Sequence, residues 1–409
     1  MNFNVSSLSP IKVFLYSWLM WVFAYFLRNF EYSYNNFSYE SSFIFLLLNL
    51  LFFFGMLLAS KGKNDIIDKK YVLKEYQLIQ IFNVLIFFAI ISCILRLYSI
   101  FFIQNYLAFE TSYEFKMSIM YEVSSAGAIG ILSSITLPAT LLILFINLIY
   151  EIVSFKSIKG FIVIAASLLL VIDSALKSSF LYIVIYIMFI FFTIILKNIY
   201  IRKKIFKVRL YYILPLFILG LVYFGYIYQF RVSDLDYVLN NRLITPNSNE
   251  VSYISFMIIN FIHYILHGYY QWVDLYNSVG LSNYYFGMIE FYPMVKFLKS
   301  FIFPNLPGMG ELMSVLPRGA VYYTFWGDFI LDFGFFSLIF SFLFGYFSFK
   351  IYLNFKKRYF VSTIFYPFIL ILIFFMPYKN LTAGVFGYFV IFVLVLKLVV
   401  TLHYIRNTE

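Results

Sequence analysis

Long apolar runs, each close to the length of a membrane-spanning helix, recur along the chain and are separated by short polar segments. A helix needs about 20 apolar residues to cross the hydrocarbon core of a bilayer. We therefore predict ten spans, over residues 11–27, 42–60, 78–103, 123–150, 161–173, 180–196, 211–229, 327–349, 361–377 and 384–402. This pattern predicts an all-α polytopic membrane protein.

The composition excludes a water-soluble protein of this length. Hydrophobic residues make up 63% of the chain and charged residues only 12%, and the mean hydropathy is +0.87. Soluble domains contain about 45–50% apolar and about 25% charged residues. The only cysteine, Cys93, lies in an apolar run and has no partner for an intramolecular disulfide.

The basic residues orient the predicted spans. With the N-terminus inside, the inward segments hold 20 of the 30 lysines and arginines and the outward segments hold 9. Positive charge concentrates in cytoplasmic loops, so both termini are predicted to be cytoplasmic, as in an inner-membrane protein. The net charge of +11 follows this loop distribution, and for that reason nucleic-acid binding is excluded.

One outward loop is far longer than the others. It covers residues 230–326 and divides the chain into a bundle of spans one to seven, 1–229, and a bundle of spans eight to ten, 327–409. Within the loop, residues 251–267 and 285–303 are apolar at helical spacing but short for a span. We expect them to form interfacial or re-entrant helices.

Four arginines are candidates for binding an anionic group. Arg231, Arg242 and Arg318 lie at the margins of the long outward loop, and a guanidinium can bind phosphate oxygens in a bidentate way. Arg96 lies late in the third predicted span. It either grips an anionic head group in a cavity or extends to the outer interface.

Other ionisable residues cluster near predicted span ends, and each allows two interpretations. Asp173 and Lys177 have the i,i+4 spacing of an ion pair, although Lys177 can also point at a phosphate. Asp328 and Asp332 lie one turn apart at the start of the eighth span. They either stabilise the helix N-terminus or act as acids in a cavity.

Two pairs in the long loop invite a metal interpretation. His263 and His267 share one helix face, and Asp234 and Asp236 form a D-x-D. The histidines have no acid between them and no third ligand, and two acids in a loop are common by chance, so we predict no metal site. His263 is a candidate general base for a hydroxyl, with a polar interface as the alternative.

The topology and the segment TFWGDFILDFGFFSLIFSFLFGYFSFKIY together resemble the Wzy-type polymerases of O-antigen and capsule repeat units. In that family a long periplasmic loop is often followed by a Thr, acidic residues and "DFG" that open the next span. A second similarity is Lys177-Ser178-Ser179, where relatives often have Arg. The Arg-x10-Gly pattern of some members is missing, because Arg242 and Phe329 follow Arg231 and Arg318 at that spacing.

The resemblance implies a glycosyltransferase without a cofactor that uses undecaprenyl-diphosphate-linked oligosaccharides as donor and acceptor. Arg231 and Arg318 would neutralise the diphosphate leaving group, with Arg242, Arg96 and Lys177 as further candidates. His263 or Asp328 would serve as the base. Membrane lipids, a chain-length regulator and a flippase are the other expected partners. Sugar-stacking aromatics would be Tyr269, Tyr270, Trp272, Tyr322 and Tyr323.

Two alternatives remain open on the sequence. An O-antigen ligase shares the lipid-linked donor and the late outward loop but transfers the glycan to lipid A–core. A lipid-linked oligosaccharide flippase would need charges inside the bundle and two halves of similar length. The "DFG" entry to the eighth span favours the polymerase.

Overall fold

The computed structural model is almost entirely α-helical, with two small pairs of strands. The residues it describes are 2–3, 8–32, 38–62, 75–111, 114–115, 127–176, 180–198, 206–207, 225, 244–247, 252–282, 285–312, 314, 323–381 and 385–406. Nine of the ten predicted spans coincide with described helices. The remaining one, 211–229, lies outside the described residues apart from position 225.

Long apolar helices form the first part of the bundle. They are α1 (Pro10–Leu27), α2 (Tyr39–Ser60), α3 (Glu75–Tyr98), α5 (Gly127–Tyr150), α6 (Ile158–Leu176) and α7 (Phe180–Leu196). Helix α3 continues through a π-helical turn (Ser99–Ile103) and a 3-10 turn (Tyr106–Ala108). The shortest predicted span, 161–173, is part of a 19-residue helix, α6.

The helices that follow the long loop complete the bundle. They are α13 (Phe325–Phe333), a 3-10 turn (Gly334–Phe336), α14 (Ser337–Lys356), α15 (Phe360–Phe375) and α16 (Val385–Arg406). Among the described residues, six helical segments have the length and apolar character to cross a membrane. They are Pro10–Leu27, Tyr39–Ser60, Glu75–Ala108, Ile129–Tyr150, Ile158–Leu176 and Phe325–Lys356. These six support a multi-pass membrane protein.

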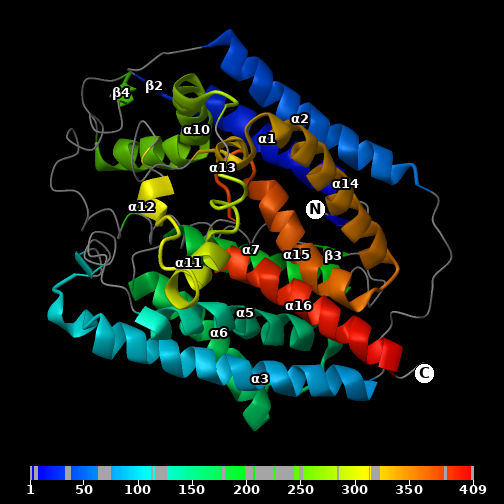
Figure 1. Cartoon of the computed structure of the whole chain (residues 1–409). Coiled ribbons are helices and arrows are strands. Elements are labelled where there is room, and N and C mark those ends of the chain that lie inside the picture. The colour runs from blue at the N-terminus through cyan, green and yellow to red at the C-terminus, as the bar shows by residue number, and fades with distance from the viewer. Residues whose placement is uncertain are drawn as a thin grey trace.

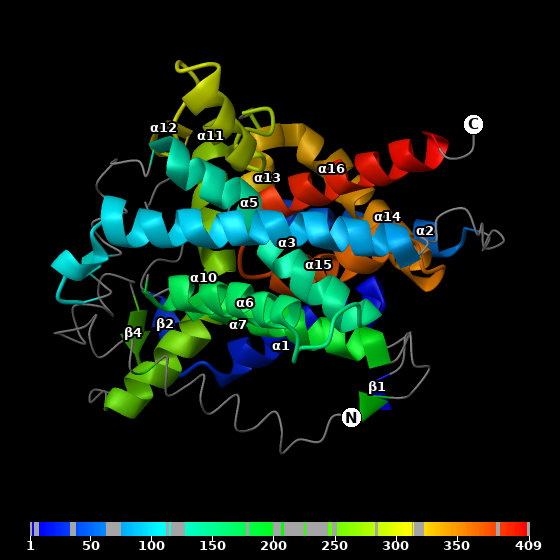
Figure 2. The same cartoon turned by 90° about the horizontal axis from the view of Figure 1, so that it is seen from below.

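The described parts of the long loop gather at one end of the bundle, as Figures 1 and 2 both show. The C-terminal end of α16 lies toward the opposite end. These loop elements are α10 (Tyr253–Val279), α11 (Tyr292–Phe301), α12 (Met309–Leu312) and strand β4 (Ile244–Pro246). Helix α10 begins at Ser252, whose hydroxyl accepts the backbone N–H of Ser255 at 3.2 Å.

A small antiparallel sheet ties the end of α1 to this loop. Strand β2 (Phe30–Tyr32) pairs with β4, with Tyr32 opposite Ile244. The sheet packs on α10 through Phe30 and Ile244, which are 1% and 2% exposed. The other pair joins β1 (Asn2–Phe3) to β3 (Phe206–Lys207).

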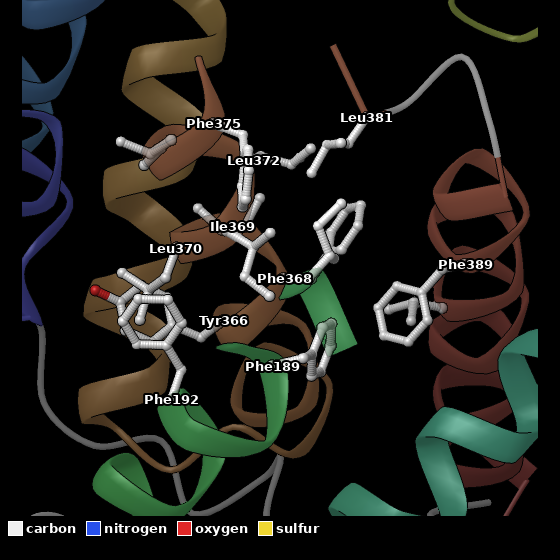
Figure 3. Packing of buried hydrophobic residues seen from close by; sticks show 14 of the residues in the cluster. Phe189, Phe192, Tyr366, Phe368, Ile369, Leu370, Leu372, Phe375, Leu381 and Phe389 are labelled. Carbon is white, nitrogen blue, oxygen red and sulfur yellow. The ribbon is translucent and has the colours of Figure 1, made fainter. Parts of the chain in front are cut away.

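Helix α15 lies in the middle of the bundle and is buried on nearly every side. Figure 3 shows Phe368 of α15 near Phe389 of α16, with Phe189 of α7 beside them. The rings of Phe368 and Phe389 are 5.0 Å apart and those of Phe189 and Phe389 are 5.6 Å apart. A helix of 16 residues rises only about 24 Å, which is less than the hydrocarbon thickness of a bilayer. The polar turn after α15 therefore starts within the bundle.

Outer helices present large apolar side chains to their surroundings. Examples are Phe26 of α1, Leu46 of α2 and Phe87 of α3, which are 78%, 56% and 61% exposed. An apolar surface of this extent is unfavourable in water and suits a hydrocarbon environment. The exposed faces of α1, α2 and α3 are thus the surfaces expected to contact lipid.

Candidate functional site

Helix α13, the segment just before α11 and the turn after α15 form a buried carboxylate cluster, which we define as Asp328, Asp332, Glu290 and Asn380. The side-chain amide of Asn380 donates to Asp328 Oδ2 at 2.9 Å and to Glu290 Oε1 at 2.7 Å. Glu290, Asp332 and Asn380 are 5% exposed or less, whereas Asp328 is only partly buried. Asp328 is thus the carboxylate that a bound molecule can reach most easily.

The turn after α15 brings Asn380 to this position. The backbone N–H of Phe325, at the start of α13, donates to the carbonyl of Met376 at 3.1 Å. Lys379 lies near the Asp328 carboxylate, and its ammonium group is 5.6 Å from the ring centre of Tyr182. The short helix α15 is therefore what allows a cation and an amide to approach Asp328.

Asp332 holds the segment that carries Glu290. Its two carboxylate oxygens accept the backbone N–H groups of Ile289 and Glu290 at 2.9 and 2.6 Å. The backbone of the same segment donates back, from Phe286 N–H to the carbonyl of Asp332 at 2.8 Å. Asp328 and Asp332 thus bond to other segments. Asp328 also lies in the first turn of α13, whose N-cap residue, Thr324, makes no side-chain capping bond.

Replacing Asp332 with asparagine is expected to lower the free energy of unfolding by about 1–2 kcal/mol. An amide presents only one acceptor oxygen to two buried N–H groups, and an unsatisfied buried donor costs about 1–3 kcal/mol. Unfolding of the purified protein in detergent measures the effect. Glu110→Gln is the control, since Glu110 is exposed. Equal stability of the two variants would show that Asp332 does not hold this segment.

A second polar cluster lies where α1, β2 and α10 meet, and we call it the histidine–tyrosine cluster. It consists of Arg28, Tyr32, His263, His267 and Tyr270. Nδ1 of His263 is 2.9 Å from the hydroxyl of Tyr32. The rings of Tyr32 and Tyr270 are 4.0 Å apart. The β2–β4 sheet fixes Tyr32 in this position, 231 residues away from His263 in the sequence.

The two histidines are buried and stacked, with ring centres 5.0 Å apart. Nδ1 of His267 is within 3.1 Å of the carbonyl oxygen of His263 and 3.2 Å of that of Tyr264. Carbonyl oxygens only accept, so Nδ1 of His267 carries the hydrogen. In its neutral form His267 therefore accepts a proton only at Nε2.

Arg28 supplies the cation of this cluster. Its guanidinium donates to the hydroxyl of Tyr270 and, at 3.3 Å, to that of Tyr25. It also lies 4.2 Å from the ring centre of Tyr25. Burial raises the pKa of Tyr270, and the positive charge of Arg28 opposes this rise. Sequence reasoning missed Arg28, because a single arginine after a span is ordinary there; the only signal was its place directly after α1.

Helix α10 links the two clusters. At Gly268 it packs closely against the turn after α15, since a Cβ there would lie 2.9 Å from the carbonyl oxygen of Tyr378. Farther along α10, the indole N–H of Trp272 donates to the carbonyl of Ser41 at 3.0 Å. The hydroxyl of Tyr276 donates to Glu40 at 2.9 Å, and burial together with this bond raises the pKa of Tyr276 to about 12.

The predicted sugar-stacking residues differ in accessibility. Trp272 and Tyr323 are 0% and 4% exposed, so a sugar would have to displace their neighbours to stack on them. Tyr270 is only partly buried and lies beside Arg28. Of these three, Tyr270 has the environment that best suits a sugar ring.

Arg96 forms a bidentate ion pair with Asp173, which joins α3 to α6. Arg96 Nε and Nη2 lie 2.8 and 2.7 Å from the two oxygens of Asp173. The i,i+4 alternative for Asp173 involves Lys177, which lies outside the described residues.

Burial lowers the pKa of Lys296 on α11, and the charge of Arg96 lowers it further. Loop helix α11 thus lies near this ion pair.

The remaining predicted phosphate-binding residues, Arg231, Arg242, Arg318 and Lys177, lie outside the described residues, as do Asp234, Asp236 and Tyr322. Within the described part of the chain, no three His, Cys, Asp or Glu side chains are placed to hold a metal ion.

Comparison of the chain with protein-family models, with curated proteins and with solved structures gives no match. The arrangement of residues is therefore the basis for any functional interpretation. In chemical terms, one end of an apolar bundle contains a partly buried carboxylate, a pair of buried histidines and a cation bonded to tyrosines.

Proposed function

We propose that this chain is a Wzy-type polymerase of undecaprenyl-diphosphate-linked repeat units. In this proposal it has ten spans, and both termini lie on the cytoplasmic side of a bacterial inner membrane. The observation that carries the proposal is the position of both polar clusters. The histidine–tyrosine cluster is built largely from α10 and the carboxylate cluster largely from α13. Both lie at the end of the bundle where the long loop gathers. Polar groups at that end can meet a lipid-linked glycan at the periplasmic surface.

The proposed reaction transfers the growing chain onto the incoming unit. The bond between the anomeric carbon of the chain and its diphosphate breaks, and the lipid diphosphate leaves with the bonding electrons. A hydroxyl oxygen of the incoming unit forms the new bond to that carbon, and its proton passes to a base. Arg231 and Arg318 are proposed to neutralise the leaving diphosphate, assisted by Arg242 and Lys177.

Asp328 is a better base in this proposal than His263. It is partly accessible, and the hydrogen bond from Asn380 engages only one of its oxygens. His263 is 7% exposed and already bonded to Tyr32 through Nδ1. We therefore assign proton transfer to Asp328, and to His263 the positioning of Tyr32 beside Tyr270.

Asp328→Asn is expected to reduce chain extension by about 10²–10⁴-fold, the range typical for loss of a general base. The modal glycan length in a strain expressing this variant, compared with equal amounts of wild-type protein, measures the effect. Glu75→Gln, an exposed carboxylate in the first turn of α3, is the matched control and is expected to leave the length unchanged. A normal glycan ladder with Asp328→Asn would exclude Asp328 as the base.

A deletion strain tests the proposed function against its two alternatives. Loss of a polymerase leaves lipid A–core with a single repeat unit, whereas loss of a ligase leaves lipid A–core bare. Loss of a flippase also leaves it bare, and lipid-linked units then accumulate on the cytoplasmic side. Unchanged ladders of long chains would contradict the polymerase.

A further inference from the structure

A groove runs between α1 and α2 on the outside of the bundle. Its volume is about 350 Å³, and its surface is almost wholly apolar. The one polar lining side chain, Asn49, is engaged: its amide oxygen accepts the indole N–H of Trp326 and its amide nitrogen donates to the carbonyl of Phe45. Six of the lining residues are Phe14, Trp18, Phe45, Leu46, Leu50 and Phe53.

This groove is open to the side where lipid is expected. Leu46 and Leu50 of α2 are 56% and 41% exposed, and Leu15 of α1 is 45% exposed. All of its lining residues belong to two helices, α1 and α2. Aromatic rings form half of its lining, which suits a chain with double bonds and methyl branches.

A line of aromatic residues continues from the groove to Arg28 along one face of α1. The residues are spaced four and three apart, so they follow one helix stripe. The ring centres of Trp18 and Trp21 are 5.9 Å apart, as are those of Trp21 and Tyr25, and Arg28 lies over Tyr25. From Trp21 to Arg28 the helix rises about 10 Å.

In the part of the chain that the structure describes, two indole N–H groups along this line lack acceptors, and its cation lacks an anionic partner. The indole nitrogens of Trp18 and Trp21 are buried, and neither has a hydrogen-bond partner among the described residues. Within the same residues, Arg28 bonds to tyrosine hydroxyls and has no carboxylate at ion-pair distance. Buried donors without acceptors are unfavourable, because they have lost their hydrogen bonds to water. A ligand that brings anionic oxygens would relieve this cost.

We propose that the groove binds the isoprenoid chain of a polyprenyl diphosphate and that Arg28 and Trp21 bind its phosphate oxygens. This inference rests on the proposed function, because it locates the lipid of the lipid-linked substrate. A guanidinium suits phosphate oxygens, and an indole N–H adds a further donor. Because Arg28 belongs to the histidine–tyrosine cluster, the phosphate would then lie at the edge of this cluster, beside Tyr270.

Direct binding of undecaprenyl diphosphate to the full-length purified protein tests this site by native mass spectrometry. Arg28→Ala and Leu50→Trp, which fills the groove, are each expected to weaken binding by about tenfold or more. Trp21→Phe, which removes only the indole N–H, is expected to weaken it by several-fold. Arg28→Lys should restore part of the affinity, since it keeps the charge.

Two matched controls are expected to bind as the wild type does. Lys12→Ala removes an exposed cation at the other end of α1, and Leu58→Trp enlarges an exposed residue of α2 away from the groove. Thermal unfolding in detergent confirms that each variant is folded. Undiminished binding in both Arg28→Ala and Leu50→Trp would overturn the proposal.

Phosphatidylglycerol is the competitor that identifies the lipid. If phosphatidylglycerol at equal concentration does not displace undecaprenyl diphosphate, the isoprenoid assignment is supported. If phosphatidylglycerol competes as well as unlabelled undecaprenyl diphosphate does, the groove is a general phospholipid site and the assignment is wrong. The glycan ladder of the deletion strain is a separate measurement. A normal ladder together with Arg28-dependent lipid binding would refute the polymerase and leave the lipid site intact.

Discussion

Arg96→Ala is expected to lower the free energy of unfolding by about 3–5 kcal/mol, the cost typical of breaking a buried ion pair from one side. The side chains of Arg96 and Asp173 are only 14% and 10% exposed, and they meet through two hydrogen bonds between α3 and α6. Without the guanidinium, the Asp173 carboxylate keeps its desolvation cost and loses its bidentate partner. Unfolding of the purified protein in detergent measures the change.

Two comparisons separate this effect from simple loss of packing. The double variant Arg96→Met/Asp173→Leu replaces both charges with apolar groups and is expected to recover most of the stability. Lys197→Ala breaks the pair with Glu151, whose side chain is 60% exposed, and is expected to cost less than about 1 kcal/mol. If Arg96→Ala were as mild as Lys197→Ala, the buried pair would not hold α3 to α6.

Gly345→Leu is expected to destabilise the protein by about 3 kcal/mol or more, because α2 and α14 touch at their glycines. A Cβ on Gly345 would lie 2.0 Å from the carbonyl oxygen of Phe52. On the facing helix, a Cβ on Gly55 would lie 2.1 Å from the carbonyl oxygen of Phe342. Both obstacles are backbone atoms, so the helices must separate to admit a side chain. Figure 1 shows α2 and α14 side by side.

Gly62→Ala is the control for this prediction. It lies just after α2, and its new Cβ would meet the flexible end of Lys350 at 3.3 Å, which can move aside. We expect little change in its thermal unfolding in detergent. A Gly345→Leu protein that unfolded at the wild-type temperature would show that this close helix contact is not needed.

The positions of the helices could be predicted from the sequence, because burial in lipid requires long apolar runs whatever their neighbours are. The same criterion underestimated α10, which was expected to end at residue 267 and extends to Val279. Its last three turns combine polar and apolar residues, since one face packs against α2 through Trp272 and Tyr276. A test based on hydropathy alone does not detect such a helix.

The partners of the polar residues could not be predicted in the same way. Spacing favoured a local contact for Asp173, whereas its described partner, Arg96, is 77 residues away. The bond between Tyr32 and His263 depends on the β2–β4 sheet, and the bond between Asp328 and Asn380 depends on the short helix α15. These contacts follow from tertiary packing, which the spacing of residues along the sequence does not reveal.

Polymerisation of lipid-linked repeat units by the purified chain in proteoliposomes is the most direct test of the proposed function. With undecaprenyl-diphosphate-linked units as the only glycan substrate, we expect products with two, three and more repeats to accumulate and lipid diphosphate to be released. Formation of longer products only after lipid A–core is added, or no product larger than the input unit, would contradict the polymerase.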